Sequence, residues 1–108
     1  MVDFSPARPG EADSRRPAVI VSNDGANLSA ARLGRGVVTV VPVTSNVSRV
    51  HPFQVLLPAA DSGLSRDSKA QAEQVRAVSV DRITAKVGAL PHDLMTELDD
   101  ALRLHLAL

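Results

Sequence analysis

Short apolar runs separated by turn-forming residues dominate the chain as far as residue 80. Residues 17–22 are rich in β-branched side chains and predict a buried strand, followed by a turn at residues 23–25. Five valines in residues 37–43 give the strongest strand pattern, and Pro42 indicates that the ladder stops or bulges there. Shorter strands are predicted at residues 2–4, 53–57, 74–80 and 83–89.

A helical period replaces this pattern at the C-terminal end. Apolar residues recur there at three- and four-residue spacing, with acidic residues on the other side, and Pro91 suits the first helical position. One or two further helical turns are predicted over residues 27–33, before the break at residues 34–36. Several short strands, irregular loops and one closing helix predict a mainly β domain, a small and strongly bent barrel over residues 1–108. The apolar stripe of the helix consists of Leu94, Met95, Leu98, Ala101, Leu102 and Leu106.

The amino-acid composition limits which kinds of core and functional site the chain can form. The 108 residues include two Phe and no Trp or Tyr, so the core must be aliphatic and RNA binding on aromatic platforms is largely ruled out. The absence of cysteine excludes disulfides, thiolate zinc sites and cysteine nucleophiles, and fits a reducing compartment. No apolar run reaches the roughly 20 residues that cross a bilayer, and no secretion signal is evident, so we expect a cytoplasmic protein.

The positive and negative charges balance over the whole chain, but they are unevenly distributed along it. Twelve basic side chains match twelve acidic ones, while residues 91–108 carry a net charge of −3 and therefore leave +3 on residues 1–90. A mildly positive body can bind a phosphate backbone locally. The same distribution also fits an ordinary solvated surface with one acidic helix face, so charge alone does not decide between these interpretations.

Three segments, in order, resemble the signatures of the MazF/PemK toxins. Residues 6–11 and 16–24 resemble the family's loop and strand opening, in which an Arg-Pro step precedes an apolar strand. Residues 41–46, Val-Pro-Val-Thr-Ser-Asn, resemble its strand ending in Pro-x-Thr-Ser, and residues 70–76 resemble its Glu-Gln segment. The chain departs from the pattern at its shortened first strand and at Gly10, where the family has histidine.

The resemblance covers essentially the whole chain and implies both a fold and a function. The implied fold is an SH3-like, PemK-type bent barrel closed by a C-terminal helix. The implied function is that of a homodimeric toxin ribonuclease, which cuts single-stranded RNA at short sequences without metal or other cofactor. Its cognate antitoxin would occupy the RNA groove with a disordered acidic segment.

Metal-independent RNA cleavage uses the ribose 2′-hydroxyl as nucleophile and requires stabilisation of a charged transition state. The resemblance assigns this task to Arg16, whose guanidinium can hold two phosphate oxygens at once. Thr44 supplies a hydroxyl that can bond a phosphate oxygen or orient the 2′-hydroxyl. Glu11 is the candidate general base, or else it orients the arginine.

The remaining candidates would bind RNA around this centre. His51 could contact RNA, act as a base or be an exposed loop histidine, whereas the glutamines and the glutamate could read base edges or face solvent. His92 and His105 lie roughly 140° apart around one helix and do not form a paired-histidine ribonuclease centre. The predicted RNA-binding residues are Ser45, Asn46, His51, Gln71, Glu73 and Gln74.

Two other functions fit parts of the sequence. A non-enzymatic gyrase inhibitor of the CcdB type would act through its C-terminal helix and dimer surface and would need neither Arg16 nor Thr44. A degenerate homologue would dimerise and bind antitoxin without cutting, and the short first strand keeps this alternative open. In each case the aliphatic surface of a small bent sheet predicts a homodimer.

Overall fold

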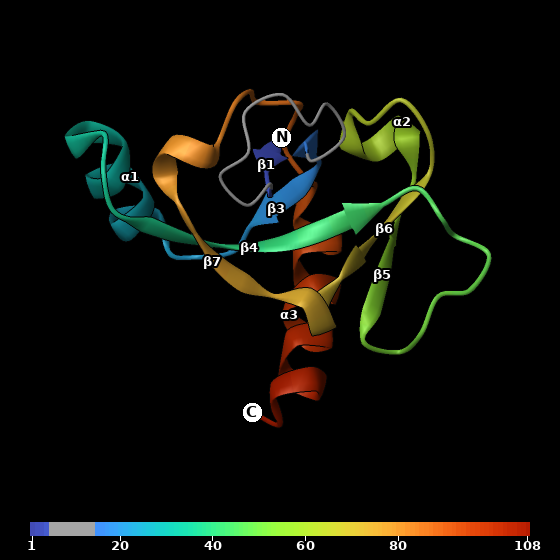
Figure 1. Cartoon of the computed structure of the whole chain (residues 1–108). Coiled ribbons are helices and arrows are strands. Elements are labelled where there is room, and N and C mark those ends of the chain that lie inside the picture. The colour runs from blue at the N-terminus through green and yellow to red at the C-terminus, as the bar shows by residue number, and fades with distance from the viewer. Residues whose placement is uncertain (5–14) are drawn as a thin grey trace.

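The structure is a computed structural model that describes residues 1–4 and 15–108 (Figure 1). Five of its strands form one antiparallel sheet of order β3-β4-β6-β5, with β7 pairing β4, and β1 pairs β2 separately. The strands are β1 (Val2–Asp3), β2 (Arg15–Arg16), β3 (Ala18–Ile20), β4 (Val37–Thr44), β5 (Gln54–Leu57), β6 (Ser68–Gln71) and β7 (Arg76–Ser79). The helices are α1 (Asp24–Leu33), α2 (Ala59–Ser62) and α3 (His92–Leu106), with 3₁₀ turns η1 (Ala72–Gln74) and η2 (Val80–Arg82).

The long strand β4 organises the sheet. One edge pairs with β3, and the other pairs first with β7 along Val37–Val40 and then with β6 along Val43–Thr44. Pro42 therefore stays inside the strand, opposite Ala18, but falls at the point where the second edge changes partner. Its missing N–H removes no ladder bond there, because neither β7 nor β6 pairs with Pro42.

The two faces of β4 enter two apolar clusters. Val41 and Val43 pack with Leu94 and Leu98 of α3, whereas the other face carries Val40 into a smaller cluster with α1 and β1. Successive side chains of a strand point to opposite faces, so the valine-rich run fills both clusters. Figure 1 shows α1 at one end of β4 and the β4–β5 loop at the other.

The ends of the helices follow local chemistry. Asn23 caps α1 by accepting a hydrogen bond from the backbone of Ala26 at 2.8 Å, so the helix begins three residues before the predicted start. Gly34, at φ 63°, ends it in the left-handed conformation that glycine adopts without strain. Pro91 is the N-cap of α3 rather than its first helical residue, because the extended backbone at Pro91 precedes the first turn.

The predicted fold class is confirmed: the domain is mainly β with a C-terminal helix, although the described strands form an open sheet rather than a closed barrel. The predicted strand at residues 83–89 is wrong, because this segment contributes only an isolated bridge from Ile83 to Val2. The Met1 ammonium donates to the Ala85 carbonyl at 2.8 Å, and burial lowers the pKa of that ammonium. The strand predicted as buried at residues 17–22 is half-buried, with Ile20 exposed.

Candidate functional site

The β3–β4 ladder leads toward Arg16 on one strand and toward Thr44 on the other. The β3–β4 register pairs Ala18 with Pro42, and Val43 N–H donates to the Pro17 carbonyl at 3.0 Å. Continued by one more residue, this register sets Arg16 opposite Thr44, and β2 contacts β4 there. The pair falls at a non-hydrogen-bonded position, where the two backbones of an antiparallel ladder approach most closely.

The same row continues into β6, where Thr44 pairs with Lys69. Val43 and its partner Ala70 belong to the cluster under α3, so Thr44 and Lys69 point to the opposite face of the sheet. That face also carries Gln54 and Gln71, which pair with each other between β5 and β6. This face, called the polar face below, thus carries a guanidinium, a hydroxyl, an ammonium and two amides, together with the exposed Leu56, which pairs with Lys69.

A loop of residues 45–53 leaves β4 beside this face. Thr44 Oγ1 accepts a hydrogen bond from the backbone of Asn46 at 3.2 Å and so keeps its own hydrogen to donate. Asn46 Oδ1 accepts a hydrogen bond from the Ser48 hydroxyl at 2.8 Å, and the Lys69 ammonium donates to the Arg49 carbonyl at 2.6 Å. Ser45 and Asn46 are exposed, which leaves them accessible to a ligand at the end of β4.

The far end of the loop is fixed by Gln54, which is 8% exposed. Its Oε1 accepts from His51 N–H at 3.0 Å, and its Nε2 donates to Glu73 Oε2 at 2.7 Å. The other oxygen of Glu73 is buried and has no hydrogen-bond partner in the described part of the chain. The His51 ring stacks on Phe53 with centroids 5.1 Å apart.

The predicted site residues therefore divide into groups. Ser45, Asn46 and Gln74 are exposed, whereas His51 and Glu73 are half-buried and engaged with neighbours. Gln71, also half-buried, lies on the polar face but a row away from Thr44. The predicted general base Glu11 lies outside the described residues.

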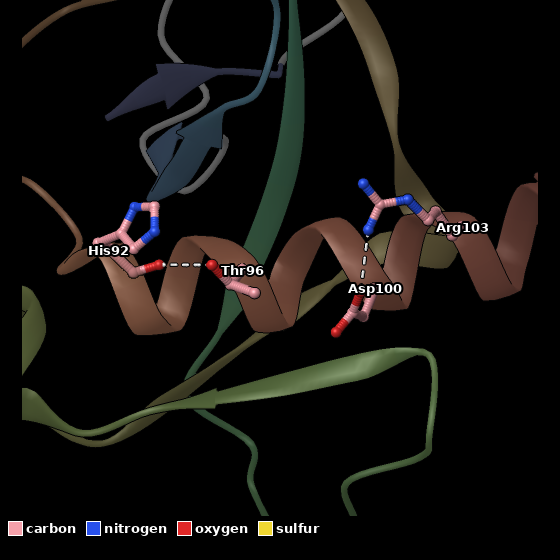
Figure 2. A network of polar contacts seen from close by, with 4 residues as sticks. All are labelled: His92, Thr96, Asp100 and Arg103. Atoms are coloured by element: carbon pink, nitrogen blue, oxygen red, sulfur yellow. Dashed lines mark hydrogen bonds and ion pairs between the residues drawn. The ribbon is translucent and has the colours of Figure 1, made fainter.

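Other parts of the described surface carry fewer polar groups that could act on a ligand. A hollow of about 570 Å³ runs from Pro17 and Val43 to Met95, and Lys86 is the one charged side chain among its described lining residues. On α3 the polar contacts stay within the helix: Thr96 bonds the His92 carbonyl, and Arg103 pairs with Asp100 at 2.9 Å (Figure 2). Exposed pairs of this kind contribute little. In residues 1–4 and 15–108 no three acidic or histidine side chains gather as ligands for a metal ion.

Comparison with known proteins identifies the family. Residues 1–106 match the model of the PemK-like, MazF-like toxins of type II toxin–antitoxin systems. The chain belongs to this family. Among curated relatives of this MazF-like toxin, endoribonuclease MazF9 of Mycobacterium tuberculosis is 56% identical over 99% of the chain and 91% of the relative. Endoribonuclease EndoA of Bacillus subtilis is 31% identical, with 98% and 88% covered.

The fold of this MazF-like toxin also matches solved structures. Mycobacterium tuberculosis toxin MazF-mt6 superposes with a TM-score of 0.74 over 89% of this chain and 90% of that chain, at 23% sequence identity. The described helices include none long and apolar enough to cross a membrane.

Two residues of the polar face, Lys69 and Gln54, were missed by the sequence analysis. In β6 the longer polar Lys69 and Gln71 alternate with the small residues Ser68 and Ala70, and this alternation was the available signal. A lysine in such a segment is ordinarily assigned to the solvent side, and only the β4–β6 pairing shows that it lies beside Thr44.

Proposed function

We propose that this chain is the toxin of a toxin–antitoxin system and cuts single-stranded RNA at a short sequence. The observation that carries the proposal is the β3–β4 register, which, continued by one residue past Pro17 and Val43, would set Arg16 opposite Thr44 at the end of β4. Membership of the PemK-like family and two relatives named endoribonucleases support it. A gyrase inhibitor of the CcdB type would need neither side chain.

The chemistry is an internal displacement at phosphorus. The 2′-oxygen attacks, the bond from phosphorus to O5′ breaks, and the products carry a 2′,3′-cyclic phosphate and a 5′-hydroxyl. Arg16, exposed and without an ion-pair partner among the described residues, would neutralise the developing negative charge. Thr44 would donate its hydroxyl hydrogen to a phosphate oxygen. Glu11 is the candidate acceptor of the 2′-hydroxyl proton, and a proton from the same group or from water completes the leaving 5′-hydroxyl.

The same arrangement suggests how partners would bind. Ser45, Asn46 and Gln74 are exposed around the row and would contact bases, together with His51, Gln71 and Glu73. A cationic row at a sheet edge would also attract the disordered acidic segment of a cognate antitoxin. A homodimer would bring two such rows to one groove, and an RNA substrate places this activity in the cytoplasm.

The test is cleavage of a long single-stranded RNA in EDTA by the wild type, Arg16→Ala and Thr44→Val. Arg15→Ala is the matched control for the arginine, because its side chain points to the other face of β2. Thr39→Val is the control for the threonine, since it lies on β4 away from the row. Circular dichroism establishes that each variant folds.

We expect cuts at one short sequence that leave 5′-hydroxyl ends. Loss of Arg16 should lower the cleavage rate by about 100-fold or more, and loss of the Thr44 hydroxyl by at least about 10-fold. Both controls should retain wild-type rates. A folded wild type that leaves RNA intact, or an Arg16→Ala variant that cuts as well as wild type, refutes the proposal and favours a non-cleaving homologue.

A further inference from the structure

Lys69 is an unusual lysine. The chain has only two lysines, and this one is 8% exposed although its side chain is charged. Lysine is rarely buried without a partner, because removing an ammonium from water is costly. Here the partner is a backbone carbonyl: Nζ donates to Arg49 O at 2.6 Å, across twenty positions of sequence. The burial of Lys69 is therefore best explained by the loop segment that its ammonium holds in place.

Among the described residues, side chains outside the loop that receives this bond hold it at three points. Near its start, Asn46 N–H bonds the Thr44 hydroxyl, and near its end His51 N–H bonds Gln54. The Lys69 bond to Arg49 is the attachment between these two, and it comes from the neighbouring strand β6. Because the ammonium bond is charge-assisted, it is the strongest of the three by chemical type.

The anchor also lies next to the proposed chemistry. Lys69 is the cross-strand partner of Thr44, so the residue that holds the middle of the loop shares a row with the hydroxyl. Any shift of this row would move the loop and the hydroxyl together. Val47 is half-buried, whereas Ser45 and Asn46 stay exposed, so the anchored loop presents a fixed set of polar groups.

We propose that Lys69 is a positioning residue that fixes the 45–53 loop against β6 and thereby sets which RNA sequence is cut. This inference rests on the proposed ribonuclease function. Lys69 acts through the loop backbone, since its ammonium bonds a loop carbonyl and no other group of the described residues, and its side chain is buried. An anchored loop discriminates between bases because its hydrogen-bonding groups do not rearrange to fit a wrong one.

The test compares Lys69→Met with Lys86→Met. Methionine keeps an unbranched stem but removes the charge and the donor. Lys86 is exposed and makes no hydrogen bond with the described residues, so its replacement causes the same change in net charge without touching the loop. If Lys69→Met does not fold, Lys69→Gln takes its place, because its shorter side chain falls short of the Arg49 carbonyl.

Two readouts separate anchoring from activity. The rate of hydrogen exchange at the loop amides, measured without RNA, shows whether the bond from Lys69 to Arg49 holds the loop in place. The ratio of kcat/KM for the preferred RNA to that for a single-base variant reports specificity. For Lys69→Met we expect loop exchange at least about 10-fold faster, unchanged exchange in α3, and a specificity ratio about 10-fold lower, mainly through KM. Lys86→Met should change neither.

Each other outcome overturns the proposal in an identifiable way. Unchanged loop exchange in Lys69→Met means that the bond does not hold the loop. Faster exchange with unchanged specificity assigns Lys69 a purely structural role. An equal loss of specificity in Lys86→Met shows an effect of net charge. A folded wild type that cuts no RNA refutes the ribonuclease function and the specificity role with it, while the exchange data still decide whether Lys69 anchors the loop.

Discussion

Replacing Gln54 with leucine removes two hydrogen bonds from the interior beneath the proposed RNA-binding loop. The amide of Gln54 accepts from His51 N–H at 3.0 Å and donates to the Glu73 carboxylate at 2.7 Å. Since Glu73 Oε1 already lacks a partner in the described residues, the change leaves both carboxylate oxygens without one. The fold must then carry a half-buried charge with no protein donor.

The expected cost follows from these two bonds. A bond to a charged group contributes about 1.5–3 kcal/mol, and a neutral backbone bond contributes about 1 kcal/mol. Burying a leucine side chain at a position that is 8% exposed returns about 1 kcal/mol of apolar transfer free energy. We therefore expect Gln54→Leu to lower the free energy of unfolding by about 1.5–3 kcal/mol. Gln74→Leu, at an exposed position, is the control and should change it by less than about 0.5 kcal/mol.

The assay is urea unfolding followed by circular dichroism, at one fixed protein concentration because self-association shifts apparent stability. A double-mutant cycle with Glu73→Leu isolates the side-chain bond: the double variant should be more stable than the sum of the single changes by about 1.5–3 kcal/mol. A coupling energy below about 0.5 kcal/mol would show that the bond between Gln54 and Glu73 contributes nothing, and would refute the reasoning.

Three further changes test the fold, each by the same unfolding measurement. Leu98→Ala, at a fully buried position of α3, should cost about 3 kcal/mol, and a loss below 1 kcal/mol would mean that α3 does not close the core. Asn23→Ala removes the side-chain cap of α1 and should cost about 1 kcal/mol, whereas an unchanged midpoint would argue against the cap. Gly63→Ala should destabilise by about 1–3 kcal/mol, because φ is 77° and the new Cβ would lie 3.0 Å from the Val87 carbonyl. Gly34→Ala, with positive φ but open space, should cost less, and the reverse order would refute the steric argument.

Periodic segments were predictable from sequence, and short polar ones were not. The β4 strand and α3 follow strong apolar patterns and form close to where those patterns place them. The β6 strand escaped prediction because Ser68–Gln71 contains no β-branched or aromatic residue; it is a strand because β4 and β5 both pair with it. The strand predicted at residues 83–89 is the opposite error, a strand predicted where none forms. The apolar residues of this segment line a hollow instead of joining the sheet.

The site was predictable only in part, for a related reason. Arg16 and Thr44 could be named from the motifs that carry them, but their pairing depends on a strand register between residues 28 positions apart. Local sequence patterns indicate which residues form strands and do not fix how the strands align. The burial of Lys69 and Gln54 was equally out of reach, because it depends on the loop that their hydrogen bonds hold.

The two proposed catalytic side chains are held very differently. Thr44 lies in the middle of its row, with β6 paired on one side and the β3 ladder continuing on the other. Arg16 lies where that ladder ends and pairs with Val2 of β1 instead. Pro17, beside it, forms only one hydrogen bond with Val43 because proline has no N–H. The hydroxyl is therefore fixed by the sheet, while the longer guanidinium keeps freedom to follow the phosphate. A reaction in which charge grows on the phosphate oxygens benefits from this division, since one donor is placed in advance and the other adjusts to the transition state.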